Sequence, residues 1–224
     1  MRIVAINGSG RKGWNTETIL KHVLKGAQGA APKIEVEMAQ LFPMRYSGCC
    51  GCHACKRKGS LPGKCHISDE LTPILEMANT ADVLVIGSPI YFFGENGGTR
   101  SFFERFIYPW MDYSQESLGT KSAKSKAVAM VYTMNVNQAI LEHHGWQNLH
   151  EPFQFFFAIV FGNCDTLWVP NTQQVADYSK YEFGFFDAND KYRSRKEDFT
   201  KDCAKAEKFG ADLVAKAKRL GLGG

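Results

Sequence analysis

The first stretch whose residues could do chemistry is the glycine-containing segment of residues 7–16, NGSGRKGWNT. Its glycines let the backbone approach an anion, Ser9, Asn15 and Thr16 can donate hydrogen bonds, and Arg11 can add charge-assisted ones. Between a strand and a helix start, such a loop binds phosphate on free backbone amides. It is not a Walker A loop, because no Lys-Ser/Thr pair follows its last glycine. The alternative is a simple capped helix start, with Asn15 or Thr16 as the N-cap.

A second stretch is rich in thiols, because five of the seven cysteines lie between residues 49 and 65. Cys49, Cys52 and Cys55 are spaced C-x2-C-x2-C, and Cys65 follows after nine further residues. This clustering indicates metal or redox chemistry rather than a disulfide framework. Four thiolates can close the shell of one metal or cluster. Zinc, redox-active thiols and reduced structural cysteines are the alternatives.

The pattern of apolar residues predicts the elements that must position these two segments. Short apolar or alternating runs predict strands at residues 2–6, 33–41, 82–87, 127–132 and 165–169. Helical spacing predicts helices at residues 16–25, 68–78, 99–111, 152–161 and 198–219. Strands that alternate with helices are typical of a parallel sheet covered on both faces.

We therefore predict an α/β fold, a flavodoxin-like, three-layer, doubly wound sheet of five parallel strands in the order 2-1-3-4-5. The predicted unit is a single domain of residues 1–224 with a cysteine-rich insert at residues 47–67. In such a sheet the ligand crevice lies at the carboxyl ends of the strands around the point where the strand order reverses. The loop after the fourth strand, which contains Thr133, is placed there by its position alone.

Two motifs resemble those of the NAD(P)H-dependent FMN reductase family and of the related iron–sulfur flavoproteins. Gly8-Ser9-x-Arg11-x3-Asn15-Thr16 resembles their FMN phosphate loop, and Gly87-Ser88-Pro89-Ile90-Tyr91 resembles their strand that ends in Ser-Pro-x-Tyr. The segment 177–181, DYSKY, resembles the C-terminal part of some members. The resemblance covers nearly the whole chain.

This resemblance implies a set of FMN-binding residues. The phosphate is expected on Ser9, Arg11, Asn15 and Thr16. The isoalloxazine ring is expected on Pro89, Ile90, Tyr91 and Phe92, and Gly94 is a looser match. Thr133 is included because it lies in the loop after the fourth strand. For the aromatic cluster at residues 91–93, ordinary core packing is the alternative. No catalytic side chain is expected, because hydride transfer to the flavin is the cofactor's own chemistry.

The cysteine segment is similar to the compact motif that carries a 4Fe–4S cluster in iron–sulfur flavoproteins. The likeness implies Cys49, Cys52, Cys55 and Cys65 as ligands and leaves Cys50 outside the ligand set. The gap before Cys65 is longer than the family's usual one, which is compatible with a loop extension or with loss of the cluster.

Composition limits the other possibilities. The net charge is +4 and the basic residues are spread along the chain; the densest stretch, residues 201–219, is interpreted as the wet face of a helix. No apolar run reaches the roughly 18 residues that cross a bilayer, and the N-terminus lacks a signal-like apolar region. We expect a cytoplasmic protein that binds neither nucleic acid nor membranes.

The leading functional hypothesis is an FMN-dependent oxidoreductase that takes electrons from NAD(P)H, or from a ferredoxin, and reduces a quinone, a flavin, a metal or a protein. The family resemblance also implies a homodimer or homotetramer. The alternatives are a non-enzymatic electron carrier, of the flavodoxin or the iron–sulfur flavoprotein type, and a redox- or metal-sensing module built on the cysteines.

Overall fold

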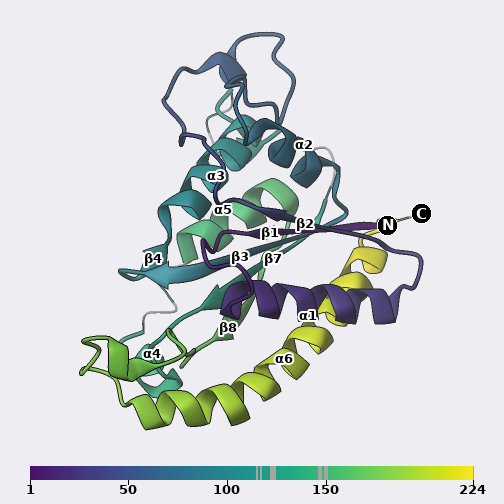
Figure 1. Cartoon of the computed structure of the whole chain (residues 1–224). Coiled ribbons are helices and arrows are strands. Elements are labelled where there is room, and N and C mark those ends of the chain that lie inside the picture. The colour runs from purple at the N-terminus through teal and green to yellow at the C-terminus, as the bar shows by residue number, and fades with distance from the viewer. Residues whose placement is uncertain (115, 117, 122–124, 146–147, 149–150, 224) are drawn as a thin grey trace.

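The computed structural model describes residues 1–223 except 115, 117, 122–124, 146–147 and 149–150. At its centre lies a parallel sheet with helices on both faces (Figure 1). Its strands lie side by side in the order β2 (Glu35–Gln40), β1 (Arg2–Asn7), β3 (Val83–Tyr91), β7 (Ala127–Thr133) and β8 (Asp165–Val169). In chain order this is 2-1-3-4-5, so the predicted flavodoxin-like doubly wound fold is confirmed.

The helices form two outer layers (Figure 1). One face of the sheet is covered by α1 (Asn15–Ala30) and α6 (Ala188–Arg219). The other face is covered by α2 (Thr72–Thr80), α3 (Gly97–Ile107) and α5 (Glu151–Phe161). Two separate hydrophobic cores result, one on each side of the sheet.

The central strand β1 shows why a nearly continuous apolar run is required here. Ile3 and Ala5 belong to the core under α1 and α6, whereas Val4 and Ile6 belong to the opposite core. All four side chains are fully buried. Successive side chains of a strand point to opposite faces, so a strand covered on both faces is apolar at every position.

Two glycines allow α1 and α6 to touch along their backbones. A Cβ atom on Gly26 would lie 1.8 Å from the carbonyl oxygen of Glu207, and one on Gly210 would lie 1.9 Å from that of Val23. Neither distance is possible between non-bonded atoms. The two helices therefore pack closely only because both crossing positions lack a side chain.

The last helix begins ten residues earlier than predicted. Residues 188–197 carry no helical apolar period, yet they form the first turns of α6. Asp187 caps this helix by accepting a hydrogen bond from the backbone N–H of Asn189. Lys191 and Ser194 are buried there against loops of the sheet, so tertiary contacts rather than local pattern extend the helix.

Other boundaries shifted less. The helix predicted at 99–111 begins at Gly97, where Asn96 caps it, and ends at Ile107 before a 3-10 turn that contains Pro109. The helix predicted from residue 68 begins at Thr72. Several short elements were not predicted, among them β4 (Gly94–Glu95), β5 (Met111–Asp112), β6 (Gly119–Thr120) and α4 (Gln138–His143).

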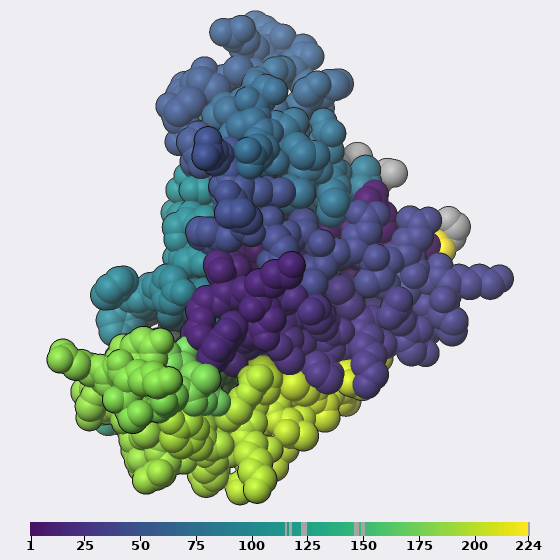
Figure 2. Space-filling model, viewed as in Figure 1, coloured from purple at the N-terminus to yellow at the C-terminus, as the bar shows by residue number. Residues whose placement is uncertain are grey.

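Two segments stand out from the layered body in the space-filling view. The blue residues of the cysteine-rich segment project at the top, and the green residues between β8 and α6 lie against the purple loop that follows β1 (Figure 2). Among the described residues, no helix is both long enough and apolar enough to span a bilayer.

Candidate flavin site

The loop between β1 and α1 is held in shape by its own polar groups. Ser9 donates its backbone N–H to the side chain of Asn7 at 3.0 Å, and Arg11 donates its N–H to the Ser9 hydroxyl at 3.2 Å. Gly13 turns the chain at a φ of +75°, a conformation that favours glycine. The N–H of Gly13 is taken by the buried carboxylate of Glu17.

The start of α1 carries no side-chain cap. Its N-cap residue is Trp14, which makes no capping hydrogen bond, while Asn15 and Thr16 already belong to the helix. The alternative of a helix capped by Asn15 or Thr16 is therefore wrong. The first N–H groups of a helix have no partner within it, so those of α1 remain available to an anion.

Arg11 is one of two adjacent exposed cations in this loop, the other being Lys12. Its guanidinium carbon lies 3.6 Å from the centre of the Trp14 ring, so the tryptophan is a platform for the charge. Burial lowers the pKa of Arg11, and Tyr91, Tyr181 and Tyr178 oppose this shift. Three aromatic residues from distant loops thus gather around one arginine.

Asn15 and Thr16 connect the loop to other parts of the chain. The Asn15 side chain donates to the carbonyl of Gln173 at 2.8 Å and accepts from Arg195 at 3.0 Å. The Thr16 hydroxyl lies 2.8 Å from the hydroxyl of Thr133, at the end of β7. The Asn15 amide side chain is already engaged, which leaves its backbone N–H as the group to bind a phosphate.

Most of the residues predicted to bind the cofactor line one hollow of about 120 Å³. They are Ser9, Arg11, Asn15, Thr16, Pro89, Ile90, Tyr91 and Thr133. They come from the ends of β1, β3 and β7 and from the start of α1. These are carboxyl ends of neighbouring parallel strands, the place where a doubly wound sheet binds ligands.

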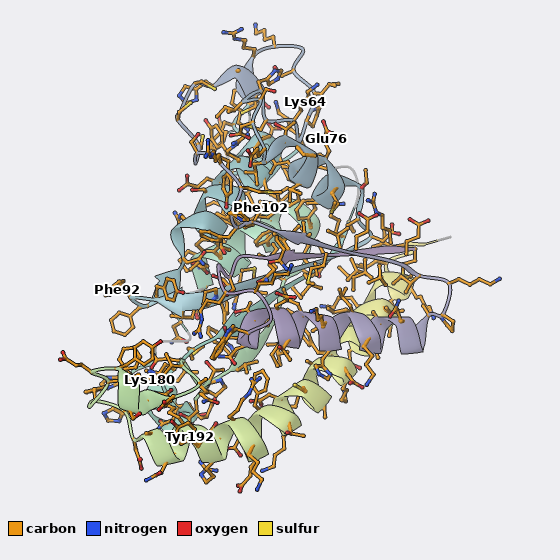
Figure 3. The ribbon with its side chains drawn as sticks, viewed as in Figure 1. Lys64, Glu76, Phe92, Phe102, Lys180 and Tyr192 are labelled. Carbon is orange, nitrogen blue, oxygen red and sulfur yellow. The ribbon has the colours of Figure 1, made fainter. Side chains whose placement is uncertain are left out.

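Phe92 lines a second hollow of about 260 Å³ that shares Ile90, Met134 and Asn135 with the first. Phe92 is fully exposed, and Tyr91 and Phe93 are half exposed, so the alternative of ordinary core packing for this cluster is wrong. Figure 3 shows Phe92 at the outer tip of its hairpin, on the same side of the molecule as Lys180.

The hairpin tip has an unusual backbone. Phe92 and Phe93 both have positive φ values, +49° and +65°, which cost bulky residues about 1–3 kcal/mol each. Gly94 lines neither hollow; it pairs with Tyr91 and begins β4. Backbone strain of this kind is common in loops that bind ligands. Here the strained backbone directs the aromatic rings into solvent.

Polar atoms without partners mark the floor of the site. Among the described residues, both side-chain polar atoms of Asn135 and the Oε1 atom of Gln174 are buried and make no hydrogen bond. Both residues line the 120 Å³ hollow. Buried polar atoms rarely stay unpaired, so these amides mark a place where a ligand with its own donors and acceptors would add hydrogen bonds.

Comparison with known proteins decides the family. Residues 1–160 match the family model described as NADPH-dependent FMN reductase. This chain belongs to that FMN reductase family. An iron–sulfur flavoprotein of Methanocaldococcus jannaschii is 32% identical over 105 residues, which are 47% of this chain and 51% of that protein. The chain thus spans about half the length of this relative.

Two further likenesses agree with the family. An iron–sulfur flavoprotein of Methanosarcina thermophila is 24% identical over 152 residues, 67% of this chain and 74% of that protein. The solved structure of an NAD(P)H:quinone oxidoreductase from Methanothermobacter marburgensis superposes with a TM-score of 0.67 at 14% identity. That match covers 95% of this chain and 98% of the other, and it shows a shared fold.

Sequence reasoning missed part of the site of this FMN reductase family member. Trp14, Met134, Asn135 and the segment 172–174 also line the first hollow. The loop after β8 begins at the same edge of the sheet as the other loops. Loops that follow neighbouring parallel strands meet at this edge, so the reasoning that placed Thr133 in the site applies to this loop equally. Nothing local marks Gln174, whose N–H is held by the hydroxyl of Tyr178.

The cysteine-rich segment of this family member lies elsewhere. Figure 1 shows it at the top of the view, beyond α2 and α3. Lys56 donates to the carbonyls of Tyr108 and Met111, which follow α3. Because α3 begins at the carboxyl edge of the sheet and runs back from it, this anchor holds the segment away from the hollows.

Arg105 makes hydrogen bonds to both ends of the cysteine-rich segment. This fully buried guanidinium donates to the carbonyls of Ser47 and Ile67 and to the carboxylate of Asp69, and it also contacts the Cys65 thiol. Arg105 holds the pKa of Asp69 below its usual range, against the opposing effect of burial. The segment is thus held by the protein's own hydrogen bonds.

The other three predicted ligands lie close enough to Cys55 to affect its pKa. Burial raises the pKa of Cys55, Lys56 opposes that rise, and Cys65, Cys49 and Cys52 add to it. Within the described residues, however, no three Cys, His, Asp or Glu side chains converge as a metal site. The four cysteines lie near one another, but their thiols do not converge as the ligands of one metal would.

The remaining two cysteines are half-buried rather than fully buried. Cys164 packs against the core under α3 and α5, and Cys203 against the core under α6. Burial raises the pKa of Cys164 to about 12. Both thus pack as small, partly buried apolar residues.

Proposed function

We propose that this protein binds FMN across the two adjoining hollows and uses it to pass electrons from NAD(P)H to an acceptor. The observation that carries the proposal is that the two ends of the site differ in chemistry. One end offers the uncapped amides of α1 beside Arg11, and the other offers the unpaired amides of Asn135 and Gln174. FMN has a phosphate at one end and a ring edge rich in donors and acceptors at the other.

In this proposal the residues bind and orient, and none acts as an acid or base. The amides of α1, the Ser9 hydroxyl and Arg11 hold the phosphate. Backbone groups of residues 89–91 lie along the ring, and Asn135 and Gln174 satisfy its polar edge. When bound, FMN supplies the redox chemistry, accepting a hydride from NAD(P)H and handing electrons on.

The exposed aromatic tip offers rings against which a planar substrate can pack. Tyr91, Phe92 and Phe93 project beside the hollows on a backbone that is strained into this shape. A planar substrate such as nicotinamide or a quinone can pack against such rings. We therefore propose a planar acceptor of the quinone or flavin class, with a metal or a protein as the remaining candidates.

A cluster on Cys49, Cys52, Cys55 and Cys65 is a second proposal. It is supported by the electrostatic influence of Cys49, Cys52 and Cys65 on Cys55 and by the names of the iron–sulfur flavoprotein relatives. The thiols would have to move closer together to bind a cluster, since they do not converge as they stand. With a cluster, the protein would fit an electron carrier as well as a reductase.

We also propose that residues 1–224 form a single domain and that the protein assembles as a homodimer or homotetramer. The aromatic residues Phe102, Phe103 and Phe106 of α3 are buried in the core and offer no contact surface. Tyr113 and Phe155 are among the exposed aromatic side chains that could contribute to one.

The test of the proposed function is direct. Protein purified without oxygen should show the visible absorption of bound flavin, and it should oxidise NADH or NADPH when a quinone or free FMN is added. A protein that binds FMN but oxidises neither nucleotide would be an electron carrier. A protein that does not bind FMN at micromolar concentration would overturn the proposal.

A further inference from the structure

The first two turns of α6 contact every loop that builds the flavin site except the hairpin tip. Arg195 donates to the side chain of Asn15 in the phosphate loop at 3.0 Å. Lys191 donates to the backbone carbonyl of Asn135 in the loop after β7. The same lysine donates to the side chain of Asn171 in the loop after β8. One helix end thus joins three loops that lie far apart in sequence.

Lys191 is the centre of this arrangement. Its side chain is almost completely buried, 3% exposed, and its ammonium bridges two loops at once. Its ammonium nitrogen lies 5.2 Å from the centre of the Phe186 ring. Burying a lysine is costly unless its ammonium is hydrogen-bonded, and here two oxygen atoms from different loops accept from it.

Neighbouring residues reinforce the hold on Asn171. Ser194 donates its hydroxyl to the Asn171 carbonyl at 2.9 Å, and the Asn171 amide donates to Asp190 at 2.9 Å. Asn171 has a positive φ of +54°, a left-handed conformation that asparagine adopts more readily than most residues, and these bonds fix it there. The loop that continues to Gln174 starts from this fixed point.

The bond from Lys191 to Asn135 has a particular consequence. It satisfies the backbone carbonyl of Asn135 and leaves the side-chain amide of the same residue without a partner. Asn135 lines both hollows. Its backbone is therefore fixed by α6, while the hydrogen-bonding capacity of its buried side-chain amide is unused.

We infer that Lys191 is the positioning residue of the flavin site, which pre-forms the loops after β7 and β8 and places a positive charge behind Asn135. The inference rests on the proposed function, because it names what holds that site. Fixing the loops before binding removes an ordering cost from the binding step. If the ring binds beside Asn135, a cation next to that residue would also favour the added negative charge of the reduced cofactor.

The chain contains a matched control. Lys126 is equally a buried lysine, and its ammonium donates to two backbone carbonyls, those of Asn79 and Ala81. It stands just before β7, whereas Asn135 stands just after it. The two lysines thus make similar bonds at opposite ends of one strand, and only Lys191 is at the carboxyl edge.

The experiment compares wild type, Lys191→Met, Lys191→Arg and Lys126→Met by FMN titration and by measurement of the reduction potential of bound FMN. Lys191→Met should weaken FMN binding about tenfold or more, which matches the loss of one charge-assisted hydrogen bond. It should also lower the potential. Lys191→Arg should recover the potential, because the charge is kept. Lys126→Met should leave both quantities within about twofold, whatever it does to thermal stability.

The outcomes separate the two proposals. A wild-type protein that binds no FMN would overturn the proposed function together with this inference. Normal FMN affinity and potential in Lys191→Met would overturn this inference alone, and so would an equal loss in Lys126→Met. If Lys191→Met does not fold, Lys191→Gln replaces it, with the same loss of affinity and potential expected.

Discussion

The hydroxyl oxygens of Thr16 and Thr133 lie 2.8 Å apart although 117 positions separate them in the chain. Both side chains are buried, at 2% and 4% exposed. One belongs to the first turn of α1 and the other to the end of β7. This single bond therefore joins the phosphate-loop side of the site to the side that holds Asn135.

Thr16→Val should lower the free energy of unfolding by about 1–3 kcal/mol, because it leaves the Thr133 hydroxyl buried without its partner. Thr133→Val should have a similar effect. The double variant should be nearly as stable as either single one, since two apolar groups of the same shape replace the pair. Urea unfolding of all four proteins checks this. Simple addition of the two losses would show that the hydroxyls do not interact.

Arg11→Ala should weaken FMN binding about 10- to 150-fold, which corresponds to the 1.5–3 kcal/mol of a charge-assisted hydrogen bond. Lys12, the adjacent exposed lysine, serves as the control, and Lys12→Ala should change the affinity far less. Riboflavin, which lacks the phosphate, should bind equally to wild type and to Arg11→Ala. Fluorescence titration with both flavins measures these constants. An unchanged FMN affinity in Arg11→Ala would remove Arg11 from the phosphate site.

Asn135→Leu should weaken FMN binding about 5- to 30-fold without destabilising the flavin-free protein, because the amide has no protein partner to lose. Asn163 is the control, since its side chain bonds the N–H of Val128 and the carbonyl of Lys126. Asn163→Leu should therefore cost about 1–3 kcal/mol of stability and leave FMN binding intact. Thermal unfolding and FMN titration separate the two effects. A large stability loss in Asn135→Leu would contradict the assignment.

Stability should depend on pH through Lys191. Burial lowers its pKa from 10.5 to about 8 in the folded protein, and Asp190 opposes the shift. The folded state therefore disfavours the charged form, and the stability that Lys191 contributes is complete above pH 10.5 and is lost as pH falls through 8. The stability of wild type relative to Lys191→Met should rise by up to about 3 kcal/mol across this range. A constant difference in urea unfolding at each pH would refute the shift.

If the four predicted cysteines hold a cluster, iron and acid-labile sulfide should each approach about four per chain after anaerobic reconstitution. Cys52→Ser should lose the cluster, whereas Cys50→Ser should keep it. Cys50 is the matched control because it is an exposed neighbour that lies outside the ligand spacing. FMN should remain in both variants, since the two sites lie on different parts of the fold. Reconstituted wild type that contains FMN alone would remove the cluster and leave the reductase.

Much of the fold and half of the site follow from local sequence. The apolar runs of β1, β3 and β7 predict buried parallel strands because a strand covered on both faces needs apolar residues throughout. Parallel strands place their carboxyl ends on one edge, so the phosphate loop, residues 89–91 and Thr133 could be expected to meet. Glycine spacing and Arg11 mark the phosphate loop because anion binding needs free amides and charge.

The tertiary structure decided the rest, because it depends on contacts between residues far apart in the chain. Nothing local distinguishes Asn135 or Gln174 as unpaired, since that depends on which groups surround them after folding. The first turns of α6 lack a helical pattern and are fixed by the bonds of Lys191 and Arg195 to distant loops. The cysteine spacing shows which thiols can act together, whereas their distance from the flavin site was set by packing on the far end of α3.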